Sequence, residues 1–351
     1  MSTLYSSSVP LTQHGHLRLP VPTVWKPQIA HGFWSALGAQ STYAPKNLEP
    51  YFEYFAEQCR LYETLGRKLP FSDYYGIIQI ANDIKNGLDR SRVYQQLEDR
   101  CRNSATTSAT LPSVDVLNDA IDLTARLLLM MDVGTPSSRM WTGRASRVWH
   151  NGSIQAFLAV VFQHQTMNRH DGIHLDRDFN ARNLYAIGGL KVELTNNLLD
   201  HLEVVDIEGE TTVMIFHHAT FLRNQEHLYF PDGMIDETLQ TIALLFPQNR
   251  WFRRTKLWHR KLEVQDADPS VLTCEATQRT TEIENYKYWH DRLVRLKLIY
   301  DQAKPRTARQ WWNDRREGTQ WYALWVVLGF TVFFGLVQSI EGAIQVYKSY
   351  H

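Results

Sequence analysis

The chain has 351 residues, with 37 Lys and Arg against 37 Asp and Glu, so its formal net charge is zero. Hydrophobic residues make up 44% and charged residues 21% of the sequence, which excludes a wholly disordered chain because such chains are less apolar and carry more net charge. The negative mean hydropathy excludes a protein with many membrane spans, and the overall charge does not indicate a nucleic-acid binder.

The first part of the chain divides by composition into three regions. Residues 1–46 are rich in Pro, Ser and His and lack the apolar run of a secretory signal, so we expect them to be largely disordered. Residues 47–102 carry apolar stripes at helical spacing and predict a helical region, with helices beginning at Asn47 and Ser72. Residues 103–112 are low in complexity and predict a linker.

The next region, residues 113–300, changes its periodicity midway. Ser113 is expected to cap a strongly amphipathic helix that ends before Gly134. Alternating apolar and polar residues from 190 to 195 predict a strand, and a hairpin is expected around Gly209. Helices are expected again at 234–246 and 282–300. The predicted fold class is therefore α+β, mainly helical, with a small antiparallel sheet and one C-terminal transmembrane helix.

The end of the chain predicts that transmembrane helix. Residues 301–320 form a basic neck, residues 321–340 contain no charged residue, and residues 341–351 are expected to be a short lumenal tail. Twenty helical residues span about 30 Å, the thickness of a hydrocarbon core. Aromatic residues stand at both borders of this run, where membrane interfaces favour them.

The charges beside the predicted span indicate its orientation. Five Lys and Arg residues lie between 304 and 316, whereas only Lys348 follows the span, so the positive-inside rule places the large N-terminal part in the cytosol. This topology is that of a tail-anchored protein, and it predicts that the glycosylation sequon at Asn151 stays unused. The endoplasmic reticulum, another endomembrane and the mitochondrial outer membrane all fit the sequence.

A weaker pattern lies within the span. Small residues spaced by four could allow two helices to approach closely in lipid, which suggests weak self-association. The residues are Thr331, Gly335, Ser339 and Ala343.

Five segments together resemble a family of uncharacterised proteins of filamentous fungi that end in one membrane helix. They are residues 120–131, 179–184, 215–219, 311–316 and 333–347. The resemblance covers about residues 115–351 and implies a fungal source and an anchored topology. It implies no activity, because none is established for that family.

Two patterns suggest chemistry. Asp178 precedes Asn183 by five residues, as in the protein-kinase catalytic loop, but the Gly-rich loop and the Asp-Phe-Gly motif are missing from the sequence. We therefore interpret this segment as a helix capped by Asp178.

The second pattern has the order of a two-His-one-carboxylate iron site, which needs its ligands on one face. The candidate ligands are His174, Asp176, His217 and His218. An iron site would require these side chains to converge in a pocket.

A basic, aromatic segment spans residues 250–261. Nucleic acid or an anionic membrane surface could each use such a segment, and the membrane is the preferred partner because the chain is already expected to be tethered there. Residues 1–248 carry a net charge of −6 and residues 249–317 a net charge of +6. The predicted membrane-surface residues are Arg250, Arg253, Arg254, Lys256, Arg260, Lys261, Arg315 and Arg316.

The sequence therefore predicts a tail-anchored, single-pass membrane protein. Its cytosolic domain is expected to bind or scaffold a protein partner at the lipid bilayer, with no cofactor and no nucleic-acid partner. The alternative is a membrane-anchored enzyme, iron-dependent in one version, that acts on a hydrophobic substrate.

Overall fold

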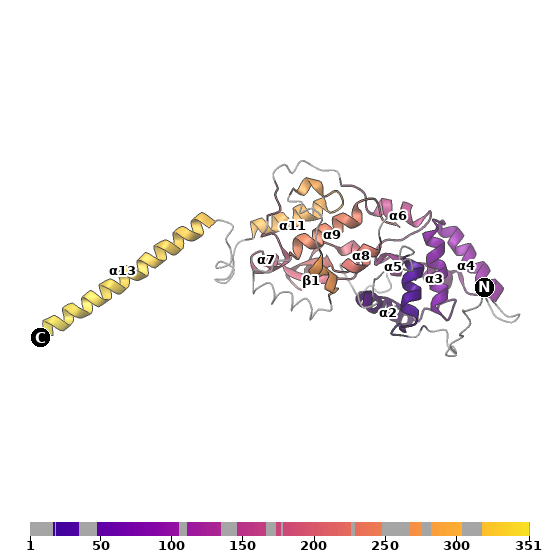
Figure 1. Cartoon of the computed structure of the whole chain (residues 1–351), viewed down its shortest axis with the longest axis horizontal. Coiled ribbons are helices and arrows are strands. Elements are labelled where there is room, and N and C mark those ends of the chain that lie inside the picture. Colours follow the sequence, from indigo (N-terminus) through magenta and orange to yellow (C-terminus); the bar gives the residue numbers. More distant parts are fainter. Residues whose placement is uncertain are drawn as a thin grey trace.

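The computed structural model describes most of the chain as a helical body followed by one long helix (Figure 1). The description covers residues 17, 19–34, 48–104, 111–134, 146–165, 173–176, 178–225, 229–247, 267–274, 282–303 and 318–350. The body comprises the described residues up to 303, and it contains helices around a small sheet. The predicted α+β class, mainly helical with one long apolar C-terminal helix, is confirmed.

Helix α5 (Val114–Leu129) lies at the centre of the N-terminal helices, and three helices pack on it. Its start is fixed by Ser113, whose Oγ accepts a hydrogen bond from the backbone N–H of Val116, as predicted. The three helices are α2 (Glu49–Thr64), α3 (Tyr74–Lys85) and α4 (Arg90–Ser104). The cap of α3 is Asp73 rather than Ser72, because the Asp73 carboxylate accepts from the Gly76 N–H.

The N-terminal segment contains one helix that the sequence did not predict. Helix α1 (Trp25–Phe33) packs on α3, and Ile29, Phe33 and Trp34 are fully buried. These large apolar side chains are few and widely spaced in a Pro-rich sequence, so their periodicity is weak. Burial against α3 stabilises the helix where local propensity does not.

Three strands form one sheet in the order β1-β3-β2. They are β1 (Lys191–Thr195), β2 (Val204–Ile207) and β3 (Glu210–Phe216). β1 pairs parallel with β3, placing Val192 opposite Val213. The sheet is therefore mixed: the β2–β3 pair is antiparallel, as the sequence predicted, and β1 adds a parallel pairing that the sequence did not predict. After β1 the chain crosses through a short 3-10 turn, η2 (Leu198–Asp200), to the far edge, so β1 and β2 flank β3 instead of pairing.

The predicted hairpin joins β2 and β3 in antiparallel pairing. Its two turn residues, Glu208 and Gly209, both have positive φ angles, 52° and 81°. Such a turn matches the right-handed twist of the strands that it joins.

The second half of the body contains further helices, one of which packs on β1. They are α6 (Ile154–Val161), α7 (Ala181–Ala186), α8 (Ala219–Asn224), α9 (Met234–Leu245) and α11 (His290–Gln302), with short 3-10 turns η3 (Pro269–Thr273) and η4 (Ile283–Asn285). The buried apolar residues form one continuous cluster from Leu17 to Tyr300. The Tyr51 hydroxyl donates to the Leu127 carbonyl, so regions on both sides of the expected linker share this core.

Helix α13 (Gly318–Tyr350) is a single helix of 33 residues outside the body (Figure 1). Its apolar span covers Tyr322–Tyr347, and none of that span is buried. The helix continues unbroken past Ile340, where the sequence suggested that the span would end. The expected lumenal tail is thus largely the last turns, nearly three of them, of the same helix.

Candidate functional site

Helix α13 is the feature that most directly indicates a function. Trp325 and Tyr347 are 22 residues apart, which corresponds to about 33 Å along a helix and matches the thickness of a hydrocarbon core. Among the described residues, only this helix is long and apolar enough to cross a membrane. Its exposed surface is dominated by large apolar side chains, among them Phe330, Phe333 and Leu336.

The predicted basic membrane surface lies outside the described residues. This applies to Arg250, Arg253, Arg254, Lys256, Arg260, Lys261, Arg315 and Arg316. Their contribution remains a prediction from the sequence.

The four residues of the small-residue pattern all lie in α13, within the part of the chain that the structure describes. The hydroxyl groups of two of its members bond within the helix: Thr331 Oγ1 donates to the Val327 carbonyl at 2.9 Å and Ser339 Oγ to the Gly335 carbonyl at 2.8 Å. Both hydroxyls are therefore satisfied without a partner helix. Any lateral contact through this region has to come from other side chains or from the glycines.

His217 and His218 are buried directly after β3, and their ring centroids lie 3.9 Å apart. The Nε2 atoms of both rings contact Asn196 Oδ1 at 2.8 Å. The Asp268 backbone N–H donates to His217 Nδ1, so a neutral His217 carries its proton on Nε2 and donates it to Asn196. Both ring nitrogens of His217 are then occupied.

Burial dominates the protonation of this pair. It lowers the pKa of His217 to about 4, and it lowers the pKa of His218 well below its ordinary value, with a further contribution from the neighbouring His217. The two rings are thus neutral at physiological pH. Neutral, hydrogen-bonded histidines in this position fasten the end of β3 to the segment that carries Asn196.

The other two iron-ligand candidates lie elsewhere. The side chain of Asp176 is exposed, with its carboxylate 3.7 Å from Lys297 Nζ, and exposed His174 forms a β-bridge with Glu282. The described residues contain no group of three or more His, Cys, Asp and Glu side chains placed to hold a metal ion. The convergence that an iron site would require of His174 and Asp176 with His217 or His218 is therefore not present in the described residues. The histidine pair follows a buried strand, whereas the other two residues lie on the surface.

A buried carboxylate that the sequence did not reveal, Asp268, lies beside the histidine pair and bonds His217 through its backbone N–H. Asp268 accepts hydrogen bonds from the backbone N–H groups of Thr220 and Ser270, and also from the Thr220 hydroxyl. Burial raises the pKa of Asp268, while these donors oppose the rise. Asp268 caps η3 and so ties that turn to the first turn of α8. The Asp-Pro-Ser sequence at 268–270 is the available signal, since Asp before Pro often begins a turn.

A second buried carboxylate holds the start of α11. The Glu237 carboxylate accepts the backbone N–H groups of Lys287, Tyr288 and Trp289 at 2.7–2.8 Å. Burial raises the pKa of Glu237, and the three backbone donors oppose the rise. These bonds satisfy N–H groups that precede the helix, so Glu237 acts as a buried cap.

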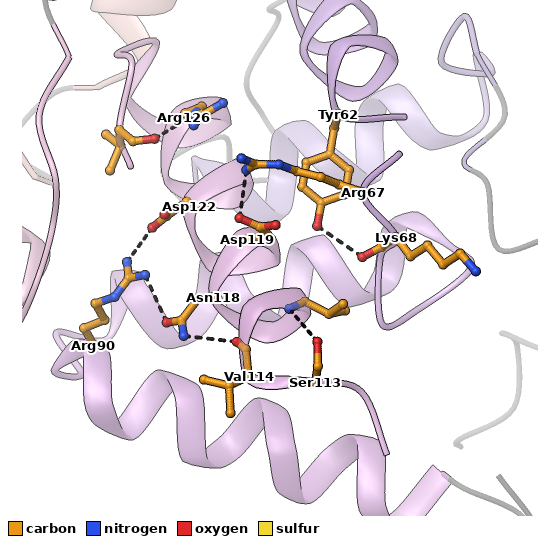
Figure 2. A network of polar contacts seen from close by, with 12 residues as sticks. Tyr62, Arg67, Lys68, Arg90, Ser113, Val114, Asn118, Asp119, Asp122 and Arg126 are labelled. Atoms are coloured by element: carbon orange, nitrogen blue, oxygen red, sulfur yellow. Dashed lines mark hydrogen bonds and ion pairs between the residues drawn. The ribbon is translucent and has the colours of Figure 1, made fainter. Parts of the chain in front are cut away.

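The polar face of α5 carries a third network, shown in Figure 2. Arg90 lies 2.6 Å from Asp122 and also donates to Asn118, while Arg67 pairs with Asp119 at 2.7 Å. The Arg90 guanidinium also lies over the Trp149 ring, 5.3 Å from its centroid. This network joins α4 and the segment before α6 to α5, and we interpret it as structural.

The kinase-like segment forms α7. Its cap is Asn180, whose Oδ1 accepts the Asn183 backbone N–H, and not Asp178 as predicted. Asp178 contributes only its backbone carbonyl, which accepts from Asn183 Nδ2 at 2.8 Å. The contact between Asp178 and Asn183 is therefore part of the turn that begins α7.

Comparisons with family models, curated proteins and solved structures find no match to this chain. Its function is therefore argued from its own residues.

Proposed function

We propose that this protein is a single-pass membrane protein that α13 anchors with its body on the cytosolic side. The observation that carries the proposal is the unburied apolar span Tyr322–Tyr347. Exposed in water, a surface of Phe, Leu, Val and Ile along 26 residues would be strongly unfavourable, whereas in lipid it is favourable.

The charge distribution supports the orientation. Lys304, Arg306, Arg309, Arg315 and Arg316 precede the span, and Lys348 alone follows it. Basic residues near a span are retained on the cytosolic side. Residues 249–317, which directly precede the span, carry a net charge of +6, and residues 1–248 carry −6, so the basic part of the chain adjoins the anionic lipid surface.

Fractionation of cells that express the full chain tests the anchor. The full chain should stay in the membrane pellet after alkaline carbonate extraction, whereas a variant ending at residue 317 should become soluble. Release of the full chain by carbonate would contradict the proposal. The total amount of each variant is measured in the same fractions. Degradation of the truncated variant is thereby distinguished from its release into the soluble fraction.

The tail-anchored topology is a finer part of the proposal. In that topology the span inserts after synthesis has ended, so full-length chain released from ribosomes should still insert when membranes are added. Insertion that requires membranes during translation would contradict a tail anchor while leaving the single span in place.

We also propose that the body binds a protein partner, and α6 provides the observation. Ala156, Ala159 and Val160 lie at helical spacing on its exposed side, and Val160 is 68% exposed. Only Ile154 and Leu158 of this apolar helix are buried. We call these three exposed residues the α6 surface. Apolar residues that share the exposed face of a helix offer a partner protein a surface to pack against.

Proximity labelling in native membranes tests this surface. Val160→Asp should remove a discrete set of labelled neighbours while leaving membrane retention intact. Val114→Asp is the matched control, because Val114 is 61% exposed and lies at the first turn of α5. Identical neighbour sets for wild type and Val160→Asp would refute a role for the α6 surface.

A further inference from the structure

Six small or polar residues of α13 recur at alternating spacings of four and three. An average spacing of 3.5 residues keeps a row on one slowly winding face of a helix, as in left-handed helix pairs. The opposite face carries Phe333, Leu336 and Ile340. We call the row the α13 seam, and its residues are Thr331, Gly335, Gln338, Gly342, Gln345 and Ser349.

The seam differs from the small-residue pattern suggested by the sequence. Positions spaced by four throughout drift about 40° per step around a helix, so Ser339 and Ala343 turn progressively away from Thr331. The seam keeps Thr331 and Gly335 and then follows the alternating spacing. It thereby replaces Ser339 and Ala343 with two amides and a glycine.

The polar residues of the seam lie at membrane depth. If Trp325 and Tyr347 mark the two interfaces, Gln338 lies about 13 Å and Glu341 about 9 Å inside the second one. Glu341 flanks the seam, three residues after Gln338. Amide and carboxyl groups at such depth are costly unless they find hydrogen-bond partners.

The chain does not supply these partners within its described residues. The hydroxyl groups of Thr331 and Ser349 donate to carbonyls of their own helix. The side chains of Gln338, Glu341 and Gln345 are exposed and make no hydrogen bond in the described part of the chain. The amides of Gln338 and Gln345, which can both donate and accept, therefore face outward along one side of α13 together with the carboxyl group of Glu341.

The glycines of the seam also lack a cause within the chain. A Cβ atom added at Gly335 or Gly342 would meet nothing within 4 Å, and both residues lie in regular helix. Glycine in a helix is less stable than alanine by about 1 kcal/mol in water, so close approach from outside the chain would explain both. Gly329 is equally open but lies off the seam, so openness alone does not define this face.

We propose that α13 pairs in parallel with α13 of a second copy of this chain along the seam. The proposal rests on the membrane insertion proposed above. Two copies with the same orientation place Gln338 against Gln338 and Gln345 against Gln345, and each amide can both donate to and accept from its counterpart. The glycines allow the backbones to approach. A second copy is the natural occupant because the seam is self-complementary and carries no charge along its midline.

Disulfide cross-linking of the full chain in native membranes tests the pairing. Thr331→Cys should form a cross-linked dimer on mild oxidation, because its Cα would lie within disulfide range of its counterpart. Phe333→Cys, on the opposite face at nearly the same depth, is the control. The wild-type chain reports any background from its own cysteines, of which Cys59 and Cys274 are buried.

A second set of variants distinguishes contacts through the seam from general effects of substitution on the helix. In the Thr331→Cys chain, Gly335→Leu with Gly342→Leu should lower dimer yield at least about fivefold, and Gln338→Leu with Gln345→Leu should do the same. Gly329→Leu should leave the yield unchanged. Carbonate extraction of the same membranes reports whether each variant is inserted.

The outcomes distinguish the two proposals. Inserted chains that cross-link equally from both faces, or that tolerate the seam substitutions, would overturn the pairing and leave the anchor standing. Chains that carbonate releases would overturn both.

Discussion

Helices α5 and α13 are both rich in apolar residues, but they are stabilised in opposite ways. Eleven of the sixteen residues of α5 are buried by other parts of the chain, whereas none of the apolar span of α13 is. Asp119 and Asp122 of α5 are paired with Arg67 and Arg90. The polar side chains Gln338, Glu341 and Gln345 of α13 lack partners within the described chain. Helix α5 is therefore stabilised by its own protein, whereas α13 needs an environment outside it.

The largest expected effect comes from charging α13. Val332→Arg with Leu336→Arg places two guanidinium groups near the middle of the span, off the seam, at a cost of roughly 2.5–3.5 kcal/mol each on insertion scales. The variant should leave the membrane pellet almost completely on carbonate extraction. Val332→Leu with Leu336→Val is the control and should be retained. Retention of the doubly charged variant would contradict a spanning role for α13.

The next largest effect is expected from a substitution that removes one partner of a charge pair on α5. Asp122→Ala should lower the free energy of unfolding by about 3 kcal/mol, because it leaves the Arg90 guanidinium unpaired in a nearly closed site. The two side chains of this pair are 11% and 12% exposed. Urea unfolding of the full chain in detergent measures the change.

The matched control for that variant is an exposed pair. Glu98→Ala removes one of the two partners of Arg102, in a pair whose side chains are 37% and 58% exposed, and should cost no more than roughly 0.5 kcal/mol. Equal losses from the two variants would show that burial does not strengthen the α5 network.

An intermediate effect concerns pH. The folded pKa of His217 is lowered to about 4 from its ordinary value of 6.5, so below pH 6.5 the unfolded chain gains a proton that the folded chain does not. Stability should therefore fall as the pH drops from about 6.5 to 4, and His217 alone should account for about 2 kcal/mol at pH 5.

Unfolding measured across that pH range with His217→Gln checks the assignment. The substitution should cost stability at pH 7.5, because it disturbs the bonds to Asn196 and Asp268, yet it should flatten the fall between pH 6.5 and 5. An unchanged slope would show that His217 does not titrate as its burial implies.

The smallest effect concerns the start of α5. Ser113→Ala removes the side chain that accepts the Val116 N–H (Figure 2) and should cost about 1 kcal/mol. Ser113→Asp should restore most of the loss, since an aspartate can accept the same bond. Thermal unfolding measures both, and a lack of rescue by Asp would argue against a capping role.

The sequence predicted the parts of the fold whose signals are local. The Ser113 cap, the hairpin at Gly209 and the long apolar helix follow from neighbouring residues, and the structure contains all three. Helix α1 was missed because contacts with α3, distant in sequence, stabilise it. The parallel pairing of β1 was missed because alternating apolar and polar residues identify a strand but do not show which strand it pairs with or in which direction.

The candidate site was less predictable than the fold. His217 and His218 were correctly singled out as a pair after a strand, but the sequence did not reveal that Asn196 and Asp268 occupy their ring nitrogens. These partners lie 21 and 51 residues from His217 along the chain. Contacts across such distances depend on the assembled core, so composition and spacing could not distinguish a metal ligand from a structural histidine.

Protease protection of native membranes tests the central claim most directly, because it reports insertion and orientation together in any organelle. The full chain carries one epitope tag before Met1 and another after His351, and sealed membranes are digested with and without detergent. Protease should destroy the first tag and spare the second until detergent is added. Protection of the first tag would reverse the orientation, and loss of both tags in sealed membranes would show that α13 does not cross.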